Sequence, residues 1–156
     1  MTKSTPHDGA ARLAEHPFFH GFNQEFLWDL AKDLKDRTFE AGEFLVREGA
    51  PATEFLLIVS GKVALEMSTP ERPRLTIQTV GPGEVVGWSW LVPPRRWTLD
   101  GRALKTTRAL DLDGETIRRA LESHPAEGYR FLSRLLPVVA ERLENTRLQL
   151  LDIHAV

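Results

Sequence analysis

FLLIVSGKVALEM, residues 55–67, is the stretch that decides the fold class of this chain. It opens with an apolar run, Phe55–Val59, which has the length of a strand and ends at the turn pair Ser60-Gly61. Beyond the turn, apolar and polar or small residues alternate from Lys62 to Ser68. Alternation with a period of two is what a half-buried antiparallel strand produces. The stretch therefore predicts two β-strands separated by a tight turn.

The same texture continues on both sides of this stretch, from about residue 37 to residue 113. Leu75, Ile77 and Thr79 alternate with polar neighbours, and a similar alternation runs from Arg96 to Ala103. Turn-forming residues separate the runs at Ala41-Gly42, Gly49-Ala50-Pro51, Ser60-Gly61, Gly81-Pro82-Gly83 and Pro93-Pro94. Many short strands with closely spaced turns indicate a closed roll or a sandwich. We therefore expect a β-roll over about 37–113.

Helical patterns flank this β region. Residues 1–10 are polar and small, so we expect a flexible tail there, and apolar residues at helical spacing between Ala11 and Leu34 predict one or two short helices. After Asp113-Gly114 the sequence predicts a short helix ending at His124-Pro125 and then a long helix to about Asp152, so that helices occupy about 114–154. The length suits one domain, which we place at 11–156.

The long helix carries a heptad seam. Its apolar positions step alternately by four and three residues, at Leu132, Leu136, Val139, Leu143, Thr146, Leu150 and Ile153. The seam packs either on the β-roll of its own chain or on a partner helix. A helix of about 27 residues spans roughly 40 Å and should outrun the roll, so for its C-terminal half we favour a homodimer. Pro137 inside the helix predicts a kink or a break.

Composition excludes several function classes. The 156 residues contain no cysteine, which removes zinc fingers, iron–sulfur clusters and thiol catalysis, and the formal charge of −2 lacks the basic excess of a nucleic-acid binder. A cupin-like metalloenzyme would need histidines inside its barrel, and no histidine lies between Gly21 and Ser123. We therefore expect a protein that is not an enzyme. The chain shows neither a signal peptide nor an apolar run long enough to span a membrane, so we expect a cytoplasmic location without membrane contact.

An ordered set of glycine motifs carries the functional information. The motifs are Phe39–Leu45 with Gly42, Arg47-Glu48-Gly49, Phe55–Val63 with Gly61, and Gly83–Gly87. Each glycine suits a turn that needs positive φ or a close backbone approach. The ordered set, between short helices and a long helix, resembles the cyclic-nucleotide-binding domain family over about residues 16–152, and in particular the sensor domains of catabolite-activator-like and FNR-like regulators.

The resemblance implies a mainly β fold: an eight-stranded antiparallel β-roll of jelly-roll type, with short N-terminal helices and a long C-terminal helix. In that family the long helix closes the ligand pocket and often forms a dimer seam. The ligand phosphate sits in a cassette whose usual core is Gly-Glu-x-x-x-Leu, followed further on by Arg and a small residue. The matching segment here is Gly87-Trp88-Ser89-Trp90-Leu91-Val92-Pro93-Pro94-Arg95-Arg96-Trp97-Thr98.

The cassette matches the family pattern at some positions only. Gly87 matches, and the amides that follow it, including that of Ser89, are suited to an anion-binding nest. Arg96 or, less directly, Arg95 meets the requirement for a phosphate-binding arginine, and Thr98 supplies a small hydroxyl. Trp88 stands in place of the glutamate that accepts the ribose hydroxyl in the family, and an indole only donates.

Aromatic residues and one helix position complete the candidate ligand site. Trp88, Trp90 and Trp97 suggest either stacking on a planar ligand or a filled pocket. Thr146 matches the first of two hydroxyl residues with which the long helix of the catabolite activator protein reaches the nucleotide base, whereas Arg147 does not match the second.

Three functions remain open. The first is a regulatory sensor module that binds a small anion, with cyclic AMP or cyclic GMP as ligand and no resident cofactor. The second is a dimeric interaction or scaffold protein whose roll has lost nucleotide binding. The third is the sensor part of a transcription regulator; because the sequence ends at Val156 just after the long helix, we expect no direct DNA binding by this chain.

Overall fold

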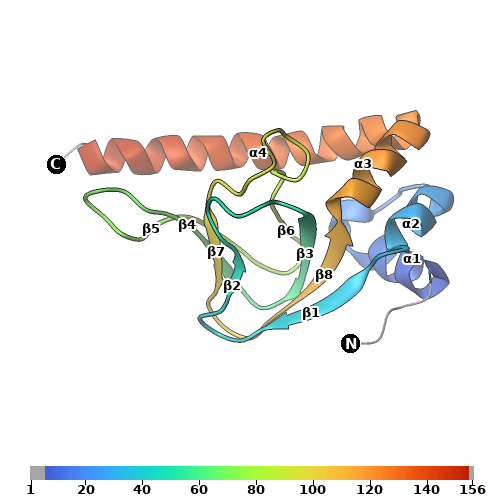
Figure 1. The fold of residues 1–156 in the computed structure, drawn as a ribbon, viewed down its shortest axis with the longest axis horizontal. Helices are drawn as coiled ribbons and strands as arrows, with labels where there is room; N and C mark the ends of the chain where they lie inside the picture. The colour runs from blue at the N-terminus through green and yellow to red at the C-terminus, as the bar shows by residue number, and fades with distance from the viewer. Residues whose placement is uncertain (1–5, 155–156) are drawn as a thin grey trace.

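The computed structural model describes residues 6–154 and places a β-roll against one long helix (Figure 1). The helices are α1 (Pro6–Glu15), the 3-10 turn η1 (Pro17–Phe19), α2 (Gln24–Ala31), α3 (Gly114–Ser123) and α4 (Pro125–His154). The strands are β1 (Lys35–Phe39), β2 (Phe44–Val46), β3 (Glu54–Ser60), β4 (Val63–Met67), β5 (Leu75–Val80), β6 (Val85–Val86), β7 (Asp100–Ala103) and β8 (Thr107–Asp113).

The strands form two four-stranded sheets, in the orders β1-β8-β3-β6 and β2-β7-β4-β5. Neighbouring strands in both sheets are antiparallel, for example with Leu57 opposite Leu110 and Leu65 opposite Gly101. The predicted eight-stranded antiparallel roll is therefore confirmed. The strand expected from Arg96 is shorter than its alternation suggested, because β7 begins only at Asp100.

The glycine motifs adopt the turns expected of them. Gly42, Gly49, Gly61, Gly83 and Gly87 all have positive φ, between 85° and 103°. Side chains at these positions would be strained because L-residues rarely populate this region. The spacing of these glycines in the sequence thus marks real corners of the roll.

The expectation of a flexible tail over 1–10 is wrong for its second half. Helix α1 begins at Pro6, and both Gly9 and Ala10 are buried. A Cβ built on Gly9 would lie 2.9 Å from the Cβ of Ala31, so the small residues that suggested a tail instead allow α1 to pack closely on α2. Residues 1–5 lie outside the described part of the chain.

Aromatic side chains tie the helices to the sheets. Phe18 of η1 meets Phe55 of β3 at 5.3 Å between ring centroids, and Phe55 meets Trp90 at 5.3 Å. Trp90 and Phe55 in turn contact Phe131 of α4, at 5.9 and 5.7 Å. Contacts of this kind stabilise beyond the area they bury. One cluster therefore fixes the start of α4 against the roll and the N-terminal helices.

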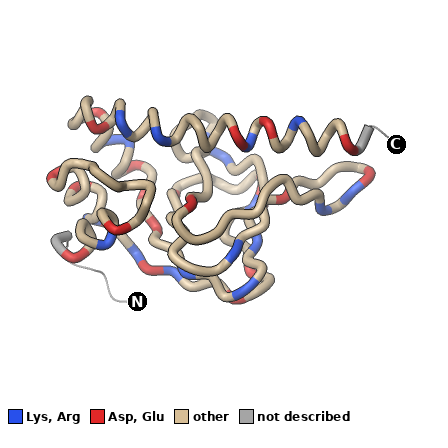
Figure 2. Tube along the Cα trace, turned by 180° about the vertical axis from the view of Figure 1, so that it is seen from behind, with Lys and Arg blue, Asp and Glu red and all other residues tan. Residues whose placement is uncertain are grey.

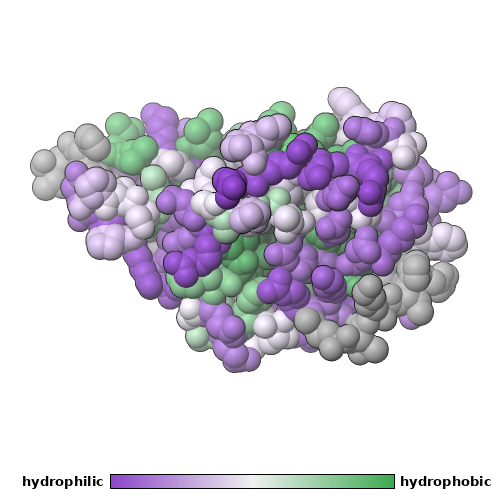
Figure 3. Space-filling model, viewed as in Figure 1, coloured by the Kyte–Doolittle hydropathy of each residue, from purple (hydrophilic) through white to green (hydrophobic). Residues whose placement is uncertain are grey.

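Helix α4 presents two different faces. Phe131 and Leu135 are buried against the roll, whereas Leu132, Leu136 and Leu143 of the heptad seam are 47%, 66% and 71% exposed. Apolar side chains appear along the edge that α4 forms in Figure 3. The alternative in which the seam packs on its own roll is therefore wrong for these leucines. The side chain of Ile153, the last seam position, lies outside the described residues.

The long helix is continuous from Pro125 to His154, so no break occurs at Pro137. Its N-terminal half is held by core contacts, which outweigh the one backbone hydrogen bond that proline removes. Acidic and basic residues are interspersed along α4 and over the roll (Figure 2). Among the helices of residues 6–154, none has the length and apolar character needed to cross a membrane.

Candidate functional site

The segment after β6 folds back on itself at Gly87. Gly87 has φ of +91°, and a Cβ built on it would lie 2.2 Å from Cζ3 of Trp97. Trp97 is held there by its backbone, which donates to the Ala50 carbonyl at 3.0 Å and accepts from the Gly49 amide at 2.8 Å. Only glycine fits under this indole. The predicted cassette thus forms a compact loop with Trp97 packed on its first residue.

Trp90 belongs to the core and not to a ligand surface. Its side chain is fully buried, and its Nε1 donates to the Gly87 carbonyl at 3.2 Å. Arg118 of α3 donates to the Trp90 carbonyl at 2.6 Å. Hydrogen bonds to the carbonyls of Gly87 and Trp90 therefore hold this loop in place.

A small cavity of about 20 Å³ lies between this loop, the roll and α4. From the cassette it is lined by Gly87, Trp88, Ser89, Trp97 and Thr98. Its other walls are Val46, Leu65, Val86, Leu99 and Arg142. The volume accommodates about one water molecule. Five of the eight predicted site residues therefore meet at one small cavity, and two of them, Trp88 and Trp97, are aromatic.

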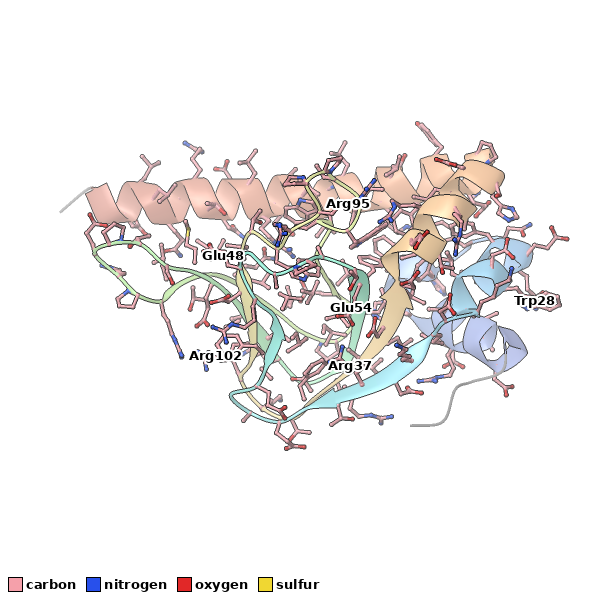
Figure 4. All side chains as sticks on the ribbon, in the orientation of Figure 1. Trp28, Arg37, Glu48, Glu54, Arg95 and Arg102 are labelled. Atoms are coloured by element: carbon pink, nitrogen blue, oxygen red, sulfur yellow. The ribbon has the colours of Figure 1, made fainter. Side chains whose placement is uncertain are left out.

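The two cassette arginines do not reach this cavity. Both are exposed; Arg96 donates from Nη1 to the Gly49 carbonyl at 2.8 Å. Arg95 has a left-handed backbone, with φ of 56°, and lies on the loop between β6 and β7 (Figure 4). A phosphate in the cavity would therefore meet neither guanidinium in this arrangement.

Thr146 is also outside the cavity. It lies half-buried on α4, and its hydroxyl donates to the carbonyl of Arg142 one turn earlier, at 2.8 Å. Such a back-bond to the helix is common for threonine. Its hydroxyl is thus occupied within the helix.

Backbone donors do line the cavity region. Within residues 6–154, no hydrogen bond uses the backbone N–H of Trp88, Ser89 or Trp90. Successive backbone N–H groups that lack partners form a concave site suited to an anion. The amides after Gly87 therefore have no partner among the described residues, and their role as an anion-binding nest stays a prediction.

Arg142 of α4 is the functional candidate that sequence reasoning missed. The residue is only 4% exposed, and its guanidinium carbon lies 4.7 Å from the ring centroid of Trp88. Its Nε donates to Oε1 of Gln78 at 3.5 Å, whereas Nη2 is buried with no hydrogen-bond partner in the described residues. Burial lowers the pKa of this guanidinium to about 10, against the opposing effect of Glu141 and Glu84.

A helical spacing in the sequence points to Arg142. The side of α4 that faces the roll carries Phe131, Leu135, Val138 and Arg142, which step by four, three and four residues. An arginine in register with core positions is unusual, since charged residues are rarely buried without a partner. The heptad seam of leucines on the other face of the helix is the stronger pattern in the sequence, and it overlaps this register.

A second, wider cavity of about 680 Å³ lies at the sheet that contains β1, β8 and β3, and Arg37, Glu54 and Asp111 are among its lining residues. Arg37 donates from Nη1 to Glu54 at 2.8 Å and to Asp111 at 3.3 Å (Figure 4). Burial, with a hydrogen bond to Glu54, raises the pKa of Asp111 to about 8. In the described part of the chain no cluster of histidine and carboxylate residues is arranged to hold a metal ion. Arg37 therefore bridges the carboxylates of Glu54 and Asp111, and this pairing is a sufficient structural role for the cluster.

Comparison with known proteins agrees with this geometry. Residues 36–124 match the model of the cyclic nucleotide-binding domain family. The chain is 26% identical over 141 residues to the CRP-like cAMP-activated global transcriptional regulator of Mycobacterium tuberculosis, a match that covers 90% of this chain and 61% of that protein. This chain thus spans less than two thirds of that relative's length.

Solved structures show the same architecture. A cyclic nucleotide-binding domain from Methylobacillus flagellatus superposes with a TM-score of 0.77 at 22% identity, covering 95% of this chain and 85% of that one. The N-terminal domain of a transcriptional regulator from Streptomyces coelicolor superposes with a TM-score of 0.61 at 29% identity, covering 86% and 92%. The chain belongs to the cyclic nucleotide-binding domain family, and its regulatory β-roll is the sensor type of that family.

Proposed function

We propose that this chain is a ligand-controlled regulatory module in which a small organic anion enters the cavity beside Gly87. A cyclic nucleotide is the first candidate, because the family and the relative activated by cyclic AMP both point to that class. The unpaired amides after Gly87 carry the proposal. They are donors that a phosphate oxygen satisfies, at the place where the family binds phosphate.

Binding requires the cavity to open. A space of about 20 Å³ holds no nucleotide, so Trp88 or Trp97 must move when the ligand enters. A ligand shifts the equilibrium between closed and open forms only by the difference in its affinity for them. The chain therefore binds with reduced apparent affinity, in proportion to the population of the open form.

The dimer is the second part of the proposal. Leu132, Leu136 and Leu143 form an exposed apolar stripe with heptad spacing, and a stripe of that period packs best on another helix with the same pattern. A second copy of α4 offers such a surface, and a twofold axis makes the contact self-complementary. The ligand pocket and the dimer surface then share one helix.

A different function, that of a dimeric interaction protein without a ligand, is favoured by one observation. Trp88 and Trp97 occupy the space that a nucleotide needs, and Trp88 replaces the acceptor for a ribose hydroxyl. A roll whose cavity is closed in this way still leaves the outer face of α4 exposed for contact with another protein chain. The role as the sensor part of a transcription regulator follows the mycobacterial relative, of which this chain matches 61%.

Titration calorimetry with cyclic AMP, cyclic GMP and 5′-AMP separates these functions. The sensor function predicts saturable binding of at least one cyclic nucleotide, accompanied by a rise in melting temperature that grows with ligand concentration. Binding of 5′-AMP with equal affinity would indicate general anion binding in place of cyclic-nucleotide recognition. A dimer that binds none of the three identifies the interaction protein.

A further inference from the structure

Arg142 has an energetic cost that the fold alone does not repay. An arginine side chain in the interior loses the hydration of its charge, and it is normally compensated by a carboxylate or by a full set of hydrogen bonds. Arg142 has one long hydrogen bond to Gln78, at 3.5 Å, and a contact with the Trp88 ring at 4.7 Å. Within residues 6–154 it forms no ion pair.

The nearest acidic residues do not remove this deficit. Glu141 and Glu84 act on Arg142 electrostatically, but neither accepts a hydrogen bond from it, and Nη2 is left without a partner. Both glutamates line a third cavity of about 120 Å³, which Arg142 also lines. On the cassette side, the lining contains no carboxylate.

We propose that Arg142 is the anion-binding residue of the pocket, so that the charged group of the ligand is held between α4 and the amides after Gly87. This inference rests on the proposed ligand-binding function and assigns the residue that recognises the ligand. Arg142, Trp88 and Ser89 line the same cavity, and each has an N–H donor without a hydrogen-bond partner in residues 6–154. The exposed Arg95 and Arg96 contribute little by comparison.

The lining also defines the ligand class. Around the guanidinium stand Val46, Leu65, Val86 and Leu99, with the indoles of Trp88 and Trp97. An anion with a flat, weakly polar body complements these walls, since aromatic faces stack on planar groups. The lining offers no carboxylate to accept a ribose hydroxyl. The pocket therefore binds cyclic AMP and its 2′-deoxy analogue with the same affinity.

The test compares arginine variants by titration calorimetry with cyclic AMP and 2′-deoxy cyclic AMP. A buried charge-assisted hydrogen bond is lost in Arg142→Gln, so the Kd rises by at least about 10-fold, and Arg142→Lys recovers part of the loss. The double variant Arg95→Gln/Arg96→Gln and the control Arg147→Gln stay within about twofold of the wild type. Arg147 lies on the same helix but is exposed and paired with Glu144 at 2.7 Å.

The outcomes separate the two proposals. Wild-type protein that binds neither nucleotide overturns the proposed function and this inference together. Wild-type binding that Arg142→Gln leaves within twofold overturns the inference alone, and a loss confined to the Arg95/Arg96 variant returns the role to the cassette. A threefold or larger preference for cyclic AMP over its 2′-deoxy analogue refutes the assigned ligand class.

Stability without ligand gives a second measurement. Replacing an incompletely paired buried charge by an apolar residue of similar length is neutral or stabilising. Arg142→Met therefore melts at the same temperature as the wild type or about a few degrees higher. A lower melting temperature together with an unchanged Kd for cyclic AMP assigns Arg142 to the structure and overturns the inference.

Discussion

Arg142 and Leu143 are neighbours on α4 but face different sides of the helix: Arg142 is 4% exposed inside the pocket, and Leu143 is 71% exposed on the outer face. Consecutive residues of an α-helix point in directions about 100° apart. The pocket and the outer apolar stripe therefore lie on two different faces of the same helix. A displacement of α4 at Arg142 therefore also displaces the exposed leucine stripe, because both lie on the same helix.

The stripe gives a prediction about mass in solution. Leu143→Arg places a charge in the proposed helix pair, so the chain elutes as a monomer of 17.6 kDa where the wild type elutes as a dimer. Light scattering coupled to size-exclusion chromatography measures this. Leu148→Arg is the matched control, because Leu148 is 48% exposed but lies outside the heptad positions. A monomeric wild type contradicts the prediction, as does a dimer that survives Leu143→Arg.

Gly87→Ala tests the close contact with Trp97. The substitution forces a side chain into a left-handed backbone and into the indole, so the free energy of unfolding falls by more than about 2 kcal/mol. Gly42→Ala is the control, with φ of +92° and open space around its Cβ. It should cost only about 1–2 kcal/mol. Urea unfolding measures the free energy of unfolding of both variants. Equal decreases in the two variants would show that Trp97 moves aside without an energetic penalty.

Asp111 makes stability depend on pH. Its pKa is raised by burial to about 8, so between pH 7 and 9 the folded protein loses a proton that the unfolded chain has already released. The free energy of unfolding then falls by about 1 kcal/mol over this range. Asp111→Asn removes the dependence and is the more stable protein at pH 9. Chemical denaturation at pH 7, 8 and 9 measures it.

The control for this experiment is Glu122→Gln, which removes an exposed carboxylate of α3. It should leave the slope of stability against pH as in the wild type. His16 does not interfere in this range. Burial lowers the pKa of its imidazole, so the imidazole is protonated, and destabilises the fold, only at acidic pH. A wild-type protein whose stability is constant from pH 7 to 9 would contradict a protonated Asp111.

The start of α3 provides a further stability test. Asp113 is the N-cap of this helix, and its Oδ2 accepts from the backbone N–H of Thr116 at 2.9 Å and from its hydroxyl at 3.0 Å. Asp113→Ala should lower the free energy of unfolding by about 1 kcal/mol. Glu115→Ala removes only an exposed pair with Arg119 and should cost less than about 0.5 kcal/mol. Thermal melts compare the two.

The strands and helices could be predicted because each depends on local pattern. Alternation around Val63 and Leu75 gave β4 and β5, and glycines such as Gly61 marked the corners. The first half of α1 was missed because it contains small residues such as Gly9, which allow close packing against Ala31 on another helix.

The site was predictable only in part. Gly87, Trp88 and Trp97 could be found because the cassette is one continuous segment. The direction of a side chain cannot be read from that segment, and so Arg95 and Arg96 were expected inward although both face solvent. Arg142 lies on α4, more than fifty residues after Gly87 in the sequence, and no local motif joins the two residues.

Pro137 has a mechanical consequence for α4. It cannot donate the backbone hydrogen bond that would reach Ser133, so the helix is softest to bending at that turn. Phe131 and Leu135, on one side of it, are fixed in the core, whereas Arg142 and Leu143 lie on the other side. A tilt of the C-terminal half about this turn leaves the aromatic core undisturbed. The tip of the helix then travels furthest, so labels placed near Leu151 would report the largest change in spacing.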